Sequence, residues 1–341
     1  MVSLEISPAE AGQRLDKFLK KYLNLAPASF IYKMLRKKNI KRNGKKADGS
    51  EKLQPGDTLE IYLSEETLAK FRQQHISDSR AKGELDILYE DKNIAIVNKP
   101  AGMLSQKAKK SDVSLIEEFS AYLYRKSTGE KSAEAEEASS KVHAFSPGVC
   151  NRLDRNTSGL VIVGKTVVGA QKMSKLLKMR EIEKYYLCIV KGKITKSKHI
   201  TAFLEKDERT NSVQVYQENG EGRVKIETAY TPTAYSENFT LLKVHLITGR
   251  SHQIRAHLAY SGHAIIGDKK YGKREDNQFF EKHYGLQHQL LHAYQLVFPI
   301  MKTPFEKLSE SKITAPVPEF FSKILTDLKE QEKWQHGTPE G

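Results

Sequence analysis

Apolar side chains recur at helical spacing near the start of the chain. The first set falls on one face of a predicted helix: Leu15, Phe18, Leu19, Tyr22 and Leu23. A second helix is expected to open at Ala28-Ser29 and to carry Ile31, Met34 and Leu35. Asn43-Gly44 is a hairpin turn signal, and Thr58 to Leu63 alternates as a strand does. The pattern predicts a small module of two helices and a short sheet.

Beyond residue 85 the pattern favours strands with interspersed helices. The strand candidates are Asp86 to Tyr89, Ile94 to Asn98, Leu160 to Gly164, Tyr185 to Lys191, Ile226 to Ala234, Asn238 to Leu246 and Gln295 to Phe298. The helix candidates are Ser114 to Tyr124, Val168 to Lys178 and Ser251 to Ala259. Strands and helices do not alternate regularly, so a doubly wound parallel sheet is disfavoured and an α+β fold is expected.

Three polar stretches interrupt these elements. Residues 65–84 are polar and charged and are predicted to be a linker. Lys126 to Lys141 is predicted to be an excursion of the second domain. Residues 326–341 are predicted to form a C-terminal tail. The expected domains are therefore residues 1–64 and 85–325.

Charge and cysteine content narrow the class of protein. The 341 residues carry a formal net charge of +14, and from Arg14 to Lys46 twelve basic residues stand against Asp16 alone. A polyanionic partner is the simplest interpretation of that excess. Cys150 and Cys188 form no Cys-x-x-Cys pair, and no apolar run reaches the length of a membrane span. We expect a cytoplasmic protein, monomeric by default.

One carboxylate is placed where catalysis could use it. Asp154 lies between Arg152 and Arg155, and the turn-prone Asn156-Thr157-Ser158-Gly159 leads from it into a β-branched strand. Neighbouring guanidinium groups favour the ionised carboxylate, which suits a nucleophile or a base. Taken alone, such a cluster is more often a solvated ion-pair network than a catalytic site.

The loop resembles a family signature. Arg152-Leu153-Asp154 with Thr157-Ser158-Gly159 is similar to the motif of the RluA-type pseudouridine synthases, in which the aspartate is catalytic. Most members have a histidine before the arginine, where this chain has Asn151. Further segments resemble the same family in the same order: Tyr89 to Gly102, Lys184 to Gly192, Thr248 to His257, Gly267 to Gly272 and Leu291 to Pro299.

The resemblance implies roles for individual residues. Asp154, Tyr186 and Arg255 are the implied catalytic residues: Tyr186 would stack on the uracil, and Arg255 would hold Asp154 through charge-assisted hydrogen bonds. Arg152 is implied to fill the space of a flipped base, and Arg250 could be structural or contact the RNA. The implied fold is a mixed, largely antiparallel sheet with flanking helices.

The N-terminal module resembles the S4 RNA-binding domain, a small α/β fold. Like charges packed this tightly repel one another unless an anion neutralises them, which favours RNA phosphates over a merely solvated basic face. The expected RNA-binding residues are Arg14, Lys17, Arg36, Lys37, Lys38, Lys41 and Arg42.

The combined prediction is an RNA pseudouridine synthase that isomerises specific uridines in structured RNA. Large-subunit (23S) ribosomal RNA is the expected substrate and partner. No cofactor and no metal are expected, because isomerisation needs neither and the histidines near His252 lack metal-site spacing. Two alternatives are a hydrolase that resembles N-glycosidases and acts on RNA, and a non-catalytic RNA-binding or ribosome assembly factor.

Overall fold

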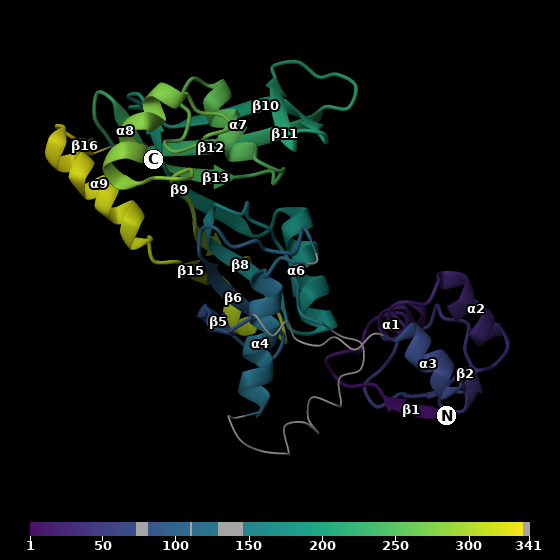
Figure 1. The fold of residues 1–341 in the computed structure, drawn as a ribbon. Helices are drawn as coiled ribbons and strands as arrows, with labels where there is room; N and C mark the ends of the chain where they lie inside the picture. Colours follow the sequence, from purple (N-terminus) through teal and green to yellow (C-terminus); the bar gives the residue numbers. More distant parts are fainter. Residues whose placement is uncertain (73–80, 110, 129–145, 337–341) are drawn as a thin grey trace. The chain divides into compact units, whose positions relative to one another are not determined.

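The computed structural model describes residues 1–72, 81–109, 111–128 and 146–336 (Figure 1). These residues fall into two compact units. The first comprises Met1–Val97, Gln106–Asn151 and Ile162–Lys175. The second comprises Asn98–Ser105, Arg152–Val161 and Leu176–Gly341. Residues 129–141 of the predicted excursion lie outside the described residues.

The first unit begins with the predicted module of helices and a short sheet. Its four-stranded antiparallel sheet has the order β1-β4-β2-β3. The elements are β1 (Val2–Glu5), α1 (Leu15–Tyr22), α2 (Ala28–Arg36), β2 (Ile40–Arg42), β3 (Lys45–Lys46) and β4 (Thr58–Ile61). Both predicted helices, the turn at Asn43-Gly44 and the strand from Thr58 are therefore confirmed.

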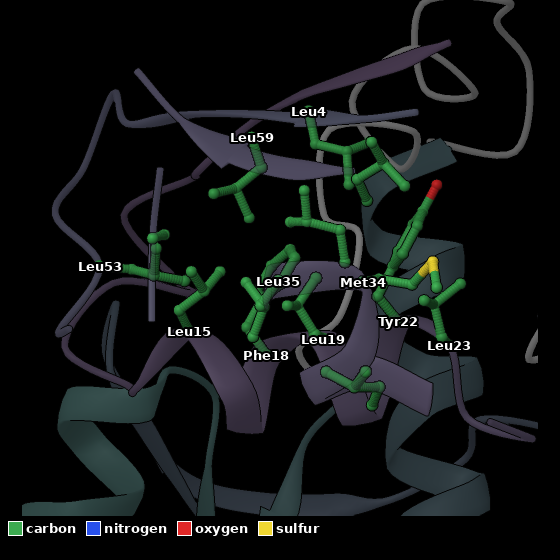
Figure 2. Close-up of a cluster of buried hydrophobic side chains, with 14 of the residues drawn as sticks. Leu4, Leu15, Phe18, Leu19, Tyr22, Leu23, Met34, Leu35, Leu53 and Leu59 are labelled. Atoms are coloured by element: carbon green, nitrogen blue, oxygen red, sulfur yellow. The ribbon is translucent and has the colours of Figure 1, made fainter. Parts of the chain in front are cut away.

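The apolar face of α1 packs against α2 and the sheet. Figure 2 shows its side chains pointing into one cluster with Leu4, Leu35 and Leu59. All five residues of the predicted apolar face of α1 are no more than 2% exposed. Burial of each such side chain stabilises the fold by about 1.5–3 kcal/mol, so this stripe is sufficient to fix the helix on the sheet.

The start of the predicted linker is a helix. α3 (Glu65–Phe71) opens where the Ser64 hydroxyl accepts a hydrogen bond from the Thr67 backbone N–H at 3.2 Å. Leu68 and Phe71 pack on the N-terminal cluster. Residues 65–71 therefore extend the N-terminal module. The sequence did not predict this, because two apolar residues one helical turn apart are too few to define a helix.

The rest of the first unit holds most of a strand region with two helices, and some residues of these elements belong to the second unit. The order of its strands is β8-β6-β5, with β7 beside β8. The elements are β5 (Asp86–Glu90), β6 (Ile94–Lys99), α4 (Leu115–Thr128), β7 (Gly148–Val149), β8 (Ser158–Gly164) and α6 (Val167–Met179). Every residue of β8 is buried, as expected for its continuous apolar run.

The second unit is built on an antiparallel sheet of order β11-β10-β12-β13-β9-β14. Its strands are β9 (Glu183–Lys191), β10 (Lys198–Asp207), β11 (Ser212–Tyr216), β12 (Val224–Tyr235), β13 (Phe239–Leu246) and β14 (Leu291–Val297). Short β15 (Lys312–Thr314) pairs with β14, and β16 (Gln335–His336) pairs with β12. The first residues of β8 pair with β14 in parallel. The predicted mixed, largely antiparallel α+β fold is confirmed.

Helices cover both faces of this sheet. α7 (Gln253–Tyr260) contributes Ala256 to a cluster on β10, β11 and β12 (Figure 1). α8 (Arg274–Tyr284) and α9 (Glu319–Gln331) pack with Ile189 of β9. Successive strand residues point to opposite faces, so Tyr186 lies on the face opposite Ile189. Residues 326–331 of the predicted tail belong to α9, and Leu328 is buried.

Candidate active site

The Asp154 loop is anchored by the strand that follows it. The Thr157 backbone N–H donates to the Asp154 carbonyl oxygen at 3.1 Å and closes a turn. Gly159 then has a φ of +108°, and a Cβ there would lie 2.2 Å from the Ala293 carbonyl oxygen of β14. Only glycine fits so close to the neighbouring backbone. The predicted loop braced by a sheet is present, and it leaves the Asp154 side chain 26% exposed.

Arg255 of α7 holds Asp154 and a second carboxylate at once. Its Nη1 donates to Asp154 Oδ2 at 2.8 Å, while Nε and Nη2 donate to the two oxygens of Asp268 at 2.7 and 3.0 Å. Burial acts to lower the pKa of Arg255, but the hydrogen bonds and negative charges of Asp268 and Asp154 outweigh burial and raise it. The guanidinium therefore stays charged and uses three of its five donors in fixed directions.

Asp268 is the anchor of this arrangement. It is fully buried, and besides Arg255 it accepts the backbone N–H groups of Lys270 and Tyr271 at 2.9 and 3.1 Å. Burial acts to raise the pKa of Asp268, but the hydrogen bonds and the charge of Arg255 lower it on balance. The motif at Gly267-Asp268 was recognised in the sequence, but the role of Asp268 as the partner of Arg255 was not predicted.

Tyr186 faces the same region from the sheet. It lies on β9 between Val244 of β13 and Ala293 of β14, and it is 6% exposed. Burial raises the pKa of Tyr186, and the negative charge of Asp154 raises it further. The phenol therefore stays protonated at neutral pH. The structure thus brings together Asp154, Tyr186 and Arg255, the three residues that the resemblance implied, although 101 residues separate Asp154 from Arg255.

Lys99, which was not predicted as a site residue, binds the Asp154 loop through the carbonyl oxygen of Arg155. Its side chain is fully buried, and Nζ donates to the carbonyl oxygens of Pro100, Met103 and Arg155 at 2.9, 2.8 and 3.0 Å. Burial lowers the pKa of Lys99 to about 7, against the attraction of Asp154. The available signal was a lysine at the end of a strand whose first four residues are apolar, because a lysine buried there needs hydrogen-bond partners.

The geometry and two comparisons with known proteins agree. The family model described as RNA pseudouridylate synthase matches residues 93–260, and the S4 domain model matches residues 13–59. Ribosomal large subunit pseudouridine synthase C of Escherichia coli is 31% identical over 335 residues, covering 95% of each chain. An uncharacterized RNA pseudouridine synthase of Mycoplasma genitalium is 31% identical over 86% of this chain and 87% of its own.

The chain belongs to the RNA pseudouridine synthase family. It is therefore an isomerase that converts uridine in RNA to pseudouridine, and it carries an S4 domain. The solved structure of human RNA pseudouridylate synthase domain containing 4 shares the fold, with a TM-score of 0.56 and 20% identity over 74% of this chain and 95% of that one. The resemblance stated from the motifs is confirmed.

The remaining predicted residues of this pseudouridine synthase lie outside the bonded network of Asp154. Arg152 is exposed on the loop, two residues before Asp154. Arg250 is also exposed, and its backbone N–H donates to Gln253 Oε1 at 3.1 Å. Asn151, the departure from the family motif described above, accepts the Ile162 backbone N–H at 2.8 Å through Oδ1. This hydrogen bond tethers the start of the loop to β8.

The predicted RNA-binding residues of the S4 domain differ in how their charges are partnered. Arg14 forms an ion pair with Asp16 at 3.0 Å, and Arg42 forms one with Asp57 at 2.7 Å. Lys41 is partly exposed, with Nζ 5.0 Å from the ring centre of Tyr62. The fully exposed members are Lys17, Arg36, Lys37 and Lys38.

The described part of the chain has neither a metal-binding cluster nor a membrane-spanning helix. These residues contain no group of three or more His, Cys, Asp or Glu side chains arranged to hold a metal ion. In the same part of the chain, no helix combines the length and apolarity required to cross a bilayer.

Proposed function

We propose that this synthase isomerises specific uridines of structured RNA, with large-subunit (23S) ribosomal RNA as its substrate, through an essential Asp154. The observation that carries the proposal is that the two oxygens of the Asp154 carboxylate are bonded differently. Arg255 binds Oδ2 at 2.8 Å, whereas among the described residues Oδ1 accepts no hydrogen bond. One oxygen is thus oriented, and the other is free for the reaction.

This arrangement suits a carboxylate that attacks or removes a proton. Isomerisation breaks the bond from the base to C1′, rotates the uracil, joins C5 to C1′ and releases the C5 proton. Asp154 supplies the nucleophile or base, and Arg255 orients it through a charge-assisted hydrogen bond. Tyr186 supplies an aromatic surface beside it for the uracil. Arg152 fills the space left by the flipped nucleotide.

The substrate class rests on the relatives and on the S4 domain. The Escherichia coli relative is named as a ribosomal large subunit synthase. The exposed cations at Lys17, Arg36, Lys37 and Lys38 supply phosphate contacts that give affinity without sequence choice. We place this RNA-binding domain at residues 1–72, because α3 packs on its core. The enzyme is proposed to act as a cytoplasmic monomer.

The glycosidase alternative requires a second carboxylate that can act as an acid. Asp268 is the carboxylate that shares Arg255 with Asp154. It is fully buried, its oxygens already accept four hydrogen bonds, and its pKa is lowered on balance. A group held in its ionised form has no proton to donate at neutral pH. The site therefore favours isomerisation over hydrolysis.

The test is tritium release from 23S ribosomal RNA transcripts containing [5-³H]uridine, with nucleosides of the digest analysed by mass spectrometry. Wild-type protein should release tritium and form a nucleoside of unchanged mass and altered retention. Asp154→Asn should release none while binding the transcript with nearly the same affinity. Free uracil would identify a glycosidase, wild-type turnover by Asp154→Asn would refute the role of Asp154, and no reaction by either protein would refute the substrate.

A second experiment tests the S4 surface. Replacing Arg36, Lys37 and Lys38 with glutamine should weaken binding of the transcript and make log Kd less dependent on log salt, by about 0.9 for each phosphate that is no longer neutralised. An unchanged slope would show that these cations are only solvated. Replacing Lys206, Lys225 and Lys269 with glutamine is the matched control, since each of these lysines lies beside a glutamate on the second unit.

A further inference from the structure

A histidine stands beside the free oxygen of Asp154. His252 Nε2 lies 3.9 Å from Asp154 Oδ1, the oxygen that Arg255 does not bind. This distance is too long for a hydrogen bond, although it brings this edge of the ring next to the carboxylate. The other ring nitrogen, Nδ1, lies 2.8 Å from the hydroxyl oxygen of Tyr271. The ring is thus placed between the carboxylate and a phenol.

The backbone fixes His252 in an uncommon conformation. Its φ of +53° is in the left-handed region, which residues with a side chain rarely adopt. The next residue, Gln253, is held in place by its side-chain amide, which accepts Thr248 Oγ1–H and the Arg250 N–H and donates to the Glu227 carbonyl oxygen. The surrounding structure therefore determines the conformation. Backbone strain held in this way, beside an active site, is a signal of function.

The partner of Tyr271 decides which ring nitrogen carries the proton. The Tyr271 hydroxyl oxygen accepts the Val213 backbone N–H at 3.0 Å, so its own proton is available for His252 Nδ1. In the opposite tautomer, His252 Nδ1–H would also donate to Tyr271, and no acceptor among the described residues would take the phenol proton. The charge of Asp154 favours the same assignment, because an N–H facing a carboxylate is attracted and a lone pair is repelled.

We propose that His252 is a positioning residue for Asp154, held by Tyr271 in the neutral tautomer whose Nε2–H faces the carboxylate oxygen that Arg255 leaves free. The inference rests on the proposed role of Asp154. A neutral donor at this distance orients Oδ1 without binding it fully, so the oxygen stays reactive. A charged imidazolium would pair with Asp154 and reduce that reactivity.

The surroundings keep the ring neutral. Burial lowers the pKa of His252, with Arg255 and Lys270 acting in the same direction and Asp154 and Asp268 opposing them. The hydrogen bond from Tyr271 to Nδ1 also favours the neutral ring, because a protonated Nδ1 could not accept it. Loss of that hydrogen bond should therefore raise the pKa of His252. The acid limb of the pH–rate profile should then move to higher pH.

The first test is Tyr271→Phe, which removes the hydroxyl and leaves the ring. Single-turnover isomerisation of the [5-³H]uridine 23S transcript, with enzyme in saturating excess, should slow by about 10- to 100-fold, as expected when a reacting group loses its orientation. The transcript Kd should change less than about twofold, and the acid limb should move up in pH. The matched control is Tyr216→Phe, which removes an exposed hydroxyl from β11, the strand that carries Val213.

Two further variants separate positioning from folding. His252→Gln keeps an N–H donor at similar reach and should retain more of the rate than His252→Ala, with both retaining RNA affinity. Wild-type rates for Tyr271→Phe and His252→Ala would overturn the proposal. A loss confined to RNA affinity would also overturn it, because it would make His252 an RNA-binding residue.

The tautomer can be measured without RNA. The ¹⁵N chemical shifts of the His252 ring in the full chain, assigned with His252→Gln, should show a proton on Nε2 alone at pH 7 and a mixture of tautomers in Tyr271→Phe. A proton on Nδ1 or a cationic ring in the wild type would overturn the proposal. Failure of the wild type to turn over the transcript would refute the substrate and leave this measurement decisive, and activity of Asp154→Asn would refute the role of Asp154.

Discussion

Replacement of Asp268 by asparagine tests whether the second carboxylate positions the first. Asp268 accepts two hydrogen bonds from Arg255 and two from backbone N–H groups, and it is fully buried. Asparagine has nearly the same shape. It lacks the charge, and it presents an amide NH₂ to donors that need an acceptor.

The geometry sets the expected size of the effect. Removing one partner of a buried ion pair costs about 3–5 kcal/mol, and we expect about 3 kcal/mol because Asp154 still compensates Arg255. For a domain of about 150–250 residues, 3 kcal/mol lowers Tm by about 6–12 °C. Arg255, freed from its anchor, would no longer hold Asp154 Oδ2 in place. A misplacement of about 1 Å reduces the rate by about 100-fold.

The assay combines thermal unfolding with single-turnover tritium release below the Tm of the variant. Asp276→Asn is the control, because this carboxylate is 27% exposed and lies 3.9 Å from Lys191, so its loss should change stability by no more than about 1 kcal/mol. Wild-type turnover by Asp268→Asn at full occupancy of the RNA would refute the idea that Asp268 positions Arg255. An unchanged Tm would refute the energetic argument.

Three further substitutions test the scaffold and the site. Gly159→Ala should destabilise the protein by more than about 4 kcal/mol in thermal unfolding, because its Cβ would lie 2.2 Å from a β14 carbonyl oxygen, whereas Gly148→Ala has open space and should be tolerated. Arg255→Lys keeps the charge without the fork, and tritium release should fall by about 100-fold with RNA affinity retained. Asp57→Asn should lose about 2–3 kcal/mol at pH 7 in denaturant unfolding. Burial acts to raise the folded pKa of Asp57, but its hydrogen bonds lower it on balance. The contribution of Asp57 to folding stability is therefore present above the unfolded pKa of about 4. The stability difference between wild type and Asp57→Asn should shrink as pH falls below that value.

The N-terminal module could be predicted closely because its signals are local. The helical spacing from Leu15 to Leu23 and the alternation from Thr58 match α1 and β4. α8 escaped prediction because only Asn277 and Phe280 are buried on it, which gives too few apolar positions to define a period. β10 escaped because charged residues follow its buried positions toward its end. Elements with only a few buried side chains do not show a clear hydrophobic period in a single sequence.

The site shows a different limit. Asp154, Tyr186 and Arg255 came from the resemblance, since no spacing rule links residues on a loop, a strand and a helix. Their approach is decided by strand pairing, which places Tyr186 opposite Val244 and Ala293. Asp268 was visible as a motif residue, but sequence cannot show which donors a buried carboxylate receives. The role of a residue in holding another residue becomes visible only in three dimensions.

The charges of the site explain why its two aspartates behave differently. Asp154, Asp268 and Arg255 together carry a formal charge of −1, and Arg255 gives two donors to Asp268 but one to Asp154. Asp268 is therefore saturated and buried, while Asp154 keeps a free oxygen and 26% exposure. Asp154 is thus the less fully compensated carboxylate, and Lys99 attracts it when the lysine is protonated. A single shared guanidinium thus creates one structural carboxylate and one carboxylate free to react.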